Sequence, residues 1–348
     1  MLTSREKVVY LQVNDGFGRW MESVEPFLAP LVEAADTFTG LTGVPVDLPA
    51  ALFLRARLAG RELPGRTSAG GSCQLLRTGD GWAAVNLARP DDVAAVPALV
   101  ALLGAEPGEG LGEAVRRVPA AEAAAGAQLL GLAASALGEA REHHVAARAE
   151  RCGERRARDL EGVRVVDLSA LWAGPLCARL LGQAGARVVK VESTTRPDGA
   201  RSGSPAFYRW LHDGHESLVL DFASAALAEV VAEADVVIEA SRPRALRRLG
   251  VVAERFLAAR PGRVWVSITG YGRDDDRIAF GDDAAVAGGL AGRDENGDPT
   301  FLGDAIADPV TGVFAAQAAA RSLAEGGGEL LSVSMAACAA SLARAPAC

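Results

Sequence analysis

The sequence of 348 residues is poor in lysine and in aromatic residues. Lys7 and Lys190 are its only lysines, and aromatic residues make up 5% of the chain. Arginine therefore has to provide nearly all recognition of anions, for which its planar guanidinium is well suited. Since 49% of the residues are hydrophobic but few are aromatic, the core is expected to consist mainly of alanine, valine and leucine. A formal net charge of −8 disfavours a broad surface for nucleic acid or for an anionic membrane.

Paired cysteines and targeting segments are also lacking. The five cysteines are scattered and form no C-x-x-C pair, which is typical of reduced thiols in a cytoplasmic protein. Residues 1–7 lead into mixed polar sequence without the apolar core of a signal peptide. The most apolar stretch, residues 123–137, is too short to span a bilayer. We therefore expect a cytoplasmic protein with neither a nucleic-acid partner nor a membrane partner.

Several common catalytic and cofactor motifs are absent as well. The chain has no G-x-G-x-x-G after its first predicted parallel strand, and no P-loop, G-x-S-x-G or H-E-x-x-H. His143 and His144 lie in a charged stretch, while His212 and His215 have no partners at metal-ligand spacing. Neither a bound dinucleotide nor a metal ion is therefore expected.

The first part of the chain has the pattern of a smaller α+β domain over residues 1–140. Two apolar runs, residues 74–77 and 82–87, flank Thr78–Gly81, and aspartate with glycine between such runs predicts a β-hairpin. Helical, alanine-rich sequence follows from residue 89. Residues 141–160 are strongly charged and are predicted to form a linker.

The hydrophobic period changes at about residue 161. Short β-rich runs at 163–168, 187–192, 234–239 and 263–269 alternate with helical sequence. This alternation predicts an α/β domain over residues 161–348, with a doubly wound, parallel, Rossmann-like sheet. Ligands of such sheets bind where the strands end, so residues just after these runs are candidates for a site.

Seven motifs in this second part, in this order, resemble the class III CoA-transferase family of the CaiB/BaiF type. The family includes formyl-CoA transferases and, as a side branch, the α-methylacyl-CoA racemases. The motifs span residues 162–175, 185–192, 234–239, 242–250, 266–272, 307–312 and 332–335. Family chains begin with the strand that starts here at Gly162, and their smaller domain follows it. The chain therefore resembles a member with a permuted domain order.

The resemblance implies an aspartate nucleophile that opens a helix and is followed four residues later by glycine. Asp308 and Gly312 occupy these positions, in Ala307-Asp-Pro-Val-Thr-Gly312. In the family this carboxylate takes CoA from an acyl-CoA and passes it to a carboxylic acid through an aspartyl-CoA thioester. CoA thioesters are then substrates, no cofactor is bound permanently, and the protein forms a homodimer. Asp308 before Pro309 is also typical of an ordinary helix N-cap, so both interpretations remain open.

The resemblance also indicates residues that contact the substrate. The backbone of Leu171 and Ala173 and the side chain of Trp172 are expected beside the thioester. Arg248 matches a position that contacts a CoA phosphate. The remaining expected binding positions are Ala240 and Ser241, where many members carry Asn-Phe, and Tyr271 and Gly272 near the acyl group.

Other acidic residues compete with Asp308, and other functions with CoA transfer. Asp282, Asp283 and Asp304 are the competing carboxylates, and Asp304 is the natural control for mutagenesis. Racemases of the family use a Gly-His-Asp triplet where this chain has Gly281-Asp282-Asp283, so racemisation lacks its second base. A thioester hydrolase on the same scaffold and a non-catalytic subunit that binds CoA or serves assembly remain as alternatives.

Overall fold

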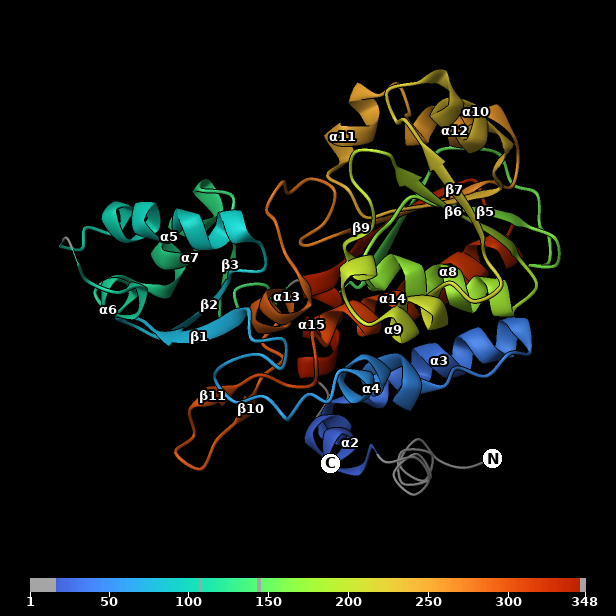
Figure 1. Ribbon diagram of the computed structural model, residues 1–348. Helices are drawn as coiled ribbons and strands as arrows, with labels where there is room; N and C mark the ends of the chain where they lie inside the picture. The colour runs from blue at the N-terminus through green and yellow to red at the C-terminus, as the bar shows by residue number, and fades with distance from the viewer. Residues whose placement is uncertain (1–16, 107, 143–144, 345–348) are drawn as a thin grey trace.

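The larger sheet of the computed structural model confirms the predicted doubly wound α/β architecture (Figure 1). The structure describes residues 17–106, 108–142 and 145–344. Seven strands follow one another across the sheet in the order β4-β12-β9-β8-β5-β6-β7. All neighbours are parallel except for β4, which runs antiparallel to β12 at one edge. The strands are β4 (Ala147–Arg151), β5 (Arg164–Asp167), β6 (Arg187–Ser193), β7 (Glu216–Leu220), β8 (Val236–Glu239), β9 (Val264–Thr269) and β12 (Glu329–Ser334).

Helices cover both faces of this sheet because the strands are apolar on both sides. Val165 and Val236 point into one core cluster, whereas their neighbours Val166 and Val237 point into another, as the alternation along a strand requires. The first face packs against α8 (Ala173–Gln183), α14 (Ala307–Ala324) and α15 (Met335–Ala343). The second face packs against α10 (Ala225–Glu233), α11 (Pro243–Arg248) and α12 (Ala253–Ala259). A short helical turn, η2 (Gly199–Ser202), and α9 (Pro205–Leu211) lie between β6 and β7.

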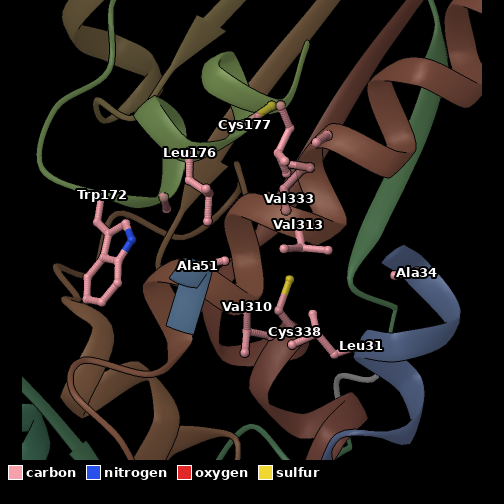
Figure 2. Packing of buried hydrophobic residues seen from close by; sticks show 14 of the residues in the cluster. Leu31, Ala34, Ala51, Trp172, Leu176, Cys177, Val310, Val313, Val333 and Cys338 are labelled. Carbon is pink, nitrogen blue, oxygen red and sulfur yellow. The ribbon is translucent and has the colours of Figure 1, made fainter. Parts of the chain in front are cut away.

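The first helices of the described chain pack on the first face, against α14. They are α2 (Gly18–Val24), the short η1 (Glu25–Phe27), α3 (Ala29–Thr42) and α4 (Leu48–Leu58). Leu31 of α3 and Ala51 of α4 belong to the same buried cluster as Val310 and Val313 of α14 (Figure 2). This packing differs from the division at residue 140 expected from the sequence, because residues 17–58 share the core of the larger sheet.

A compact α+β unit follows, at the left of Figure 1. Its antiparallel sheet has the order β1-β2-β3, and the hairpin predicted around Thr78–Gly81 is present. Three helices cover one face of this sheet, while the other face packs against Val286 and Phe301. The elements are β1 (Cys73–Arg77), β2 (Trp82–Asn86), α5 (Pro90–Leu102), α6 (Leu111–Val115), α7 (Ala120–Leu129) and β3 (Ala133–Ala136).

Two connecting segments contain short strands. The segment 141–160, expected to be a linker, contains β4, whose five residues pair with β12 in the larger sheet. After β9 the chain forms α13 (Gly281–Ala287) and a small hairpin of β10 (Gly292–Arg293) and β11 (Pro299–Thr300). No helix within the described residues has both the length and the apolar character that crossing a membrane requires.

Candidate active site

Asp308 lies in the first turn of α14, and its side chain is partly exposed between the buried residues Ala307 and Pro309. The N-cap position of α14 is occupied by Ile306, which makes no side-chain capping bond. The interpretation of Asp308 as an ordinary N-cap is therefore wrong. Ala305, just before the helix, has φ 47°, a left-handed conformation that a residue with a side chain adopts at a cost. The backbone is thus held in an unusual path immediately before Asp308.

Gly281, the first residue of α13, lies directly against the Asp308 carboxylate. A β-carbon on Gly281 would overlap with Oδ2 of Asp308 and with the carbonyl oxygen of Ala305. The backbone N–H of Gly281 donates a hydrogen bond to the carboxylate instead. Only glycine lets the two helix starts approach this closely. The triplet that begins at Gly281 therefore lies beside Asp308.

The two aspartates after Gly281 hold the start of α13 and the loop before α14 in place through hydrogen bonds. Asp282 Oδ1 accepts a hydrogen bond of 3.0 Å from the backbone N–H of Ala305. Asp283 Oδ1 accepts one of 3.0 Å from the backbone N–H of Phe280 and another of 3.0 Å from Asn86 Nδ2 of β2. Both carboxyl groups are buried. Their bonds are those of structural anchors, which distinguishes them from Asp308.

Asp304 is fully buried and bound by two arginines. Arg55 Nε donates to Asp304 Oδ2 at 2.8 Å, and one terminal nitrogen of Arg55 donates to Oδ1 at 2.5 Å. Arg61 donates to the same Oδ1 at 2.5 Å. The paired bonds of Arg55 are the bidentate arrangement that arginine forms with carboxylates. Asp304 is therefore occupied by structural contacts and is an unsuitable neutral control for Asp308.

Burial raises the pKa of the carboxyl groups around this site. Burial raises the pKa of Asp308 to about 7, against the positive charge of Arg55 and with help from the carboxylates of Asp282 and Asp304. Burial and the neighbouring Asp304 raise the pKa of Asp282 to about 6. Burial also raises the pKa of Asp283 to about 7, although the hydrogen bond from Asn86 opposes it. A raised pKa makes the ionised carboxylate more basic and a better nucleophile. A carboxylate of this kind that is also partly exposed can attack an acyl carbon.

The loop after β5 places Leu171, Trp172 and Ala173 at the start of α8, which packs against α14. Leu171 has φ 69° and is 40% exposed, and its backbone N–H donates to Asp198 Oδ1 at 2.9 Å. Lys190, buried in β6, holds this loop through its contacts with Asp198 and with the backbone carbonyl of Ser169. Both non-glycine residues with positive φ in the described chain, Leu171 and Ala305, thus lie within three residues of the candidate site residues Trp172 and Asp308.

Trp172 is buried between Phe207 and Arg55. Its ring lies 5.1 Å from that of Phe207, edge to face, and the Arg55 guanidinium lies 4.6 Å above the indole. The indole N–H finds no acceptor among the described residues. Most buried N–H groups in proteins have partners, and this donor is one of the exceptions among the described residues.

The starts of α8 and α14 meet at Gly312, one turn after Asp308. A β-carbon on Gly312 would lie 2.8 Å from the carbonyl oxygen of Ala173 and 2.9 Å from Leu176 Cβ. Glycine here is needed for the close packing of the two helices. It joins the loop of Leu171, Trp172 and Ala173 to the helix that carries Asp308.

The other predicted residues follow β8 and β9 or lie in α11. Ala240 and Tyr271 follow β8 and β9, so they share the carboxyl edge of the sheet with Leu171. Ser241 donates to Glu239 Oε2 at 3.2 Å, and the ring of Tyr271 lies 3.6 Å from the Arg277 guanidinium carbon. Within the described residues no interaction joins Asp308 to Ala240, Ser241, Arg248, Tyr271 or Gly272. Arg248 is exposed at the end of α11.

Arg55 and Arg61 are site residues that the sequence did not indicate. They lie in and just after α4, far from the motifs, and no local pattern of residues marks them. Among the described residues, no group of three or more His, Cys, Asp or Glu side chains is arranged to hold a metal ion.

More than half of the chain is similar in sequence to proteins of a known family. The model of CoA-transferase family III matches residues 160–348. A succinyl-CoA–D-citramalate CoA-transferase of Chloroflexus aurantiacus is 31% identical over 179 residues, which are 47% of this chain and 44% of that protein. The human succinyl-CoA:glutarate CoA-transferase is 31% identical over 172 residues, which are 45% of this chain and 39% of that protein.

A solved structure with similarity is that of a CaiB/BaiF family protein from Brucella suis, at 28% identity and a TM-score of 0.47. It covers 53% of this chain and 55% of that one. The chain spans less than half of the length of the curated relatives it matches. Since the family model covers more than half of the chain, including Asp308, the chain belongs to CoA-transferase family III.

Proposed function

We propose that the chain is an acyl-CoA:carboxylate CoA-transferase in which Asp308 is the nucleophile. The observation that carries the proposal is the placement of Asp308. Its carboxylate is partly exposed, rests on the backbone N–H of Gly281, and has a pKa near 7 rather than 4. The proposal is also supported by relatives whose names describe CoA transfer between succinyl-CoA and other acids.

The reaction proceeds through four exchanges at acyl carbons. The Asp308 carboxylate attacks the thioester carbonyl, the C–S bond breaks, and CoA leaves as a thiolate while a mixed anhydride remains. The thiolate attacks the Asp308 carbonyl, which forms the aspartyl-CoA thioester and releases the first acid as its carboxylate. The carboxylate of the second acid attacks this thioester, giving a new mixed anhydride and the thiolate. The thiolate then attacks the acyl carbon of the second acid and restores the Asp308 carboxylate.

The residues around Asp308 have separate tasks in this scheme. The backbone N–H of Ala173 is proposed to bind the thioester oxygen, while the Leu171 backbone, whose N–H is bonded to Asp198, and the Trp172 ring are proposed to lie beside the thioester. Arg248 at the rim is proposed to bind a CoA phosphate, and Ala240 and Ser241 the adjoining part of CoA. Tyr271 and Gly272 are proposed to flank the acyl group.

We also propose that the protein is a cytoplasmic homodimer without a permanently bound cofactor. The dimer is supported by the family resemblance. The location is supported by the free state of the four described cysteines, Cys73, Cys152, Cys177 and Cys338.

The test is intact mass measurement after brief incubation with a panel of acyl-CoAs, followed by peptide mapping. We expect a CoA-sized adduct on Asp308, which a carboxylic acid discharges to a new acyl-CoA. Asp308→Asn should abolish the adduct. Asp92→Asn, at a buried carboxylate that caps α5 in the smaller unit, should retain it.

Three other outcomes would overturn this function. Measurable CoA binding without any adduct would indicate a binding subunit. Release of free acid without transfer would indicate a hydrolase, and loss of α-deuterium from the acyl group a racemase. An adduct on another carboxylate would retain the transferase and reject Asp308.

A further inference from the structure

A hollow of about 500 Å³ lies at the turn end of the hairpin of β1 and β2. Its lining comes from four segments: the connection after α4, the hairpin, the end of α6 and the connection between β10 and β11. The described residues that line it are Arg66, Arg77, Thr78, Gly79, Trp82, Arg116 and Asp298. The volume is in the range of small-molecule sites in proteins.

Backbone contacts hold the walls of this hollow together. The N–H of Gly79, in the hairpin turn, donates to the carbonyl oxygen of Val118 at 2.9 Å, and a β-carbon on Gly79 would lie 3.2 Å from that oxygen. The turn is thereby placed against the end of α6, which carries Arg116 (Figure 1). On the other side, the N–H of Leu75 in β1 donates to the carbonyl oxygen of Arg66 at 2.8 Å. The three arginines are therefore carried by one connected backbone frame.

The hollow has an excess of positive charge, although the whole chain has a formal net charge of −8. Three of its lining residues are arginines, and of the described residues that line it only Asp298 is acidic. Arg66 Nη1 lies 3.9 Å from Asp298 Oδ2, which is too far for a hydrogen bond. Arg66 thus keeps its donors, and the mutual repulsion of the three cations favours an anion between them.

The side chain of Arg77 is supported without being neutralised. Its guanidinium carbon lies 5.4 Å from the ring centre of Trp82, its partner across the hairpin. Contact with an aromatic face stabilises a guanidinium and leaves its N–H donors available. Within the described part of the chain, no hydrogen bond or ion pair engages the side chain of Arg77 or Arg116. Planar donors of this kind match the oxygens of a phosphate group.

We propose that this hollow binds the phosphate group of a small phosphorylated molecule. Arg77 and Arg116 are the main donors, Arg66 adds charge, and Trp82 supports Arg77 from below the ligand. The hollow is much larger than a phosphate ion, so it has room for the organic part of the molecule as well. The inference depends neither on Asp308 nor on CoA transfer.

Arg117 provides a matched control for Arg116. It follows Arg116 in the chain and is also exposed, but it is bonded to Glu109 and does not line the hollow. Arg116→Gln and Arg117→Gln therefore remove the same charge from adjacent positions. Only the first of them removes a group from the proposed site.

The experiment is a ligand titration followed by ¹⁹F NMR in protein whose five tryptophans are replaced by fluorotryptophan. The Trp82 signal is assigned by its loss in Trp82→Phe. The probes are inorganic phosphate, phenyl phosphate and adenosine 3′,5′-bisphosphate, at constant ionic strength. We expect a saturable shift of the Trp82 signal, with tighter binding of the two organic phosphates. Arg77→Gln and Arg116→Gln should each weaken binding by about tenfold or more, whereas Arg117→Gln should leave it nearly unchanged.

The three probes also distinguish the sources of the phosphate group. Adenosine 3′,5′-bisphosphate carries phosphate groups of the nucleotide end of CoA, so its preferential binding would identify CoA as the ligand. Equal binding of phenyl phosphate would instead identify a separate phosphorylated molecule.

No saturable Trp82 shift with any of the probes would overturn the inference. Equally tight binding of malonate, or equal weakening in Arg117→Gln, would overturn it as well. No acyl-CoA is present in this titration, so a Trp82 response in a protein that transfers no CoA would reject the proposed function alone. A CoA adduct on Asp308 without any Trp82 response would reject the phosphate site alone.

Discussion

The environment of Asp308 disfavours the ionised form of its carboxyl group. Its carboxyl group has a pKa near 7 in the folded protein, because burial and two nearby carboxylates outweigh the effect of Arg55. In the unfolded chain the same group ionises near pH 4. The folded state therefore binds a proton that the unfolded state has already lost between these two values. The stability that this proton provides is complete below about pH 4 and is lost as the pH rises through 7.

Asp308→Asn should remove this loss. We expect the variant to match the unchanged protein in free energy of unfolding at about pH 4 and to exceed it by about 1 kcal/mol or more at pH 8. Denaturant unfolding at both pH values measures the difference. A variant that is less stable at pH 8 would show that the Asp308 carboxylate stabilises the fold, contrary to its environment.

Asp304→Asn should, in contrast, lower the free energy of unfolding. The change leaves Arg55 and Arg61 without their shared carboxylate, which we expect to cost roughly 2–3 kcal/mol, less than for fully buried arginines. It also removes a negative charge that raises the pKa of Asp308, so the acid limb of activity should move to lower pH. Thermal unfolding and a pH–rate profile measure the two effects. A variant with unchanged stability would contradict the observed bonding of Asp304.

At the scale of elements, the site is the meeting point of the first turns of α8, α13 and α14. Gly281 and Gly312 permit the contacts between them, at positions where a methyl group would strike the neighbouring helix or loop. Close packing of this kind transmits small displacements directly to the Asp308 carboxylate.

Gly281→Ala tests this geometry. The added methyl group would overlap with Asp308 Oδ2, so the carboxylate has to move, and kcat/KM should fall by about 100-fold or more. Gly288→Ala, at the other end of α13, is the matched control. Its methyl group would lie 2.6 Å from backbone atoms of Ala336 and Ala340 in α15, which should reduce stability by about 1–3 kcal/mol. Equal losses of activity in the two variants would show that the effect is general disruption of packing.

Apolar runs predicted four of the six parallel strands, β5, β6, β8 and β9, because their pattern is local, and the family resemblance indicated Asp308. Short apolar runs and the spacing of Asp308 to Gly312 are visible within a few residues. Strand β4 was not predicted, since its sequence of Ala147–Arg151 is charged and only its pairing with β12 makes it a strand. Arg55 was not predicted either, because its partners lie more than 100 residues away and its own helix has no distinguishing motif. Contacts that depend on the completed fold leave no local signal.

At the scale of the whole molecule, the first helices belong to the larger core. Six large apolar side chains in residues 17–58 are fully buried, namely Met21, Leu28, Leu31, Phe38, Leu52 and Phe53. At about 1.5–3 kcal/mol each, their burial contributes on the order of 10 kcal/mol before the entropic cost of ordering the chain. The two arginines that bind Asp304 add polar contacts to the same interface.

A cut in the exposed connection after α4 should therefore leave the molecule assembled. We expect that a protease site inserted between Glu62 and Leu63, both exposed, yields two pieces that elute together in size-exclusion chromatography. The pieces should separate only in denaturant. Release of the shorter piece under native conditions would show that residues 17–58 are a loosely attached arm.

The place of β12 in the larger sheet determines when that sheet can be completed during synthesis. Strand β12 lies between β4 and β9, both of which precede it in the chain, and Glu329 pairs with Arg151 across 178 residues. At about 5–20 residues per second, a ribosome needs roughly 10–40 s to make the chain between these partners. During that interval β4 has no neighbour and β9 has an open side, and α3 and α4 have no α14 to pack against. The nascent chain thus has to keep its apolar surfaces from aggregating until the last strand enters the gap and closes the sheet.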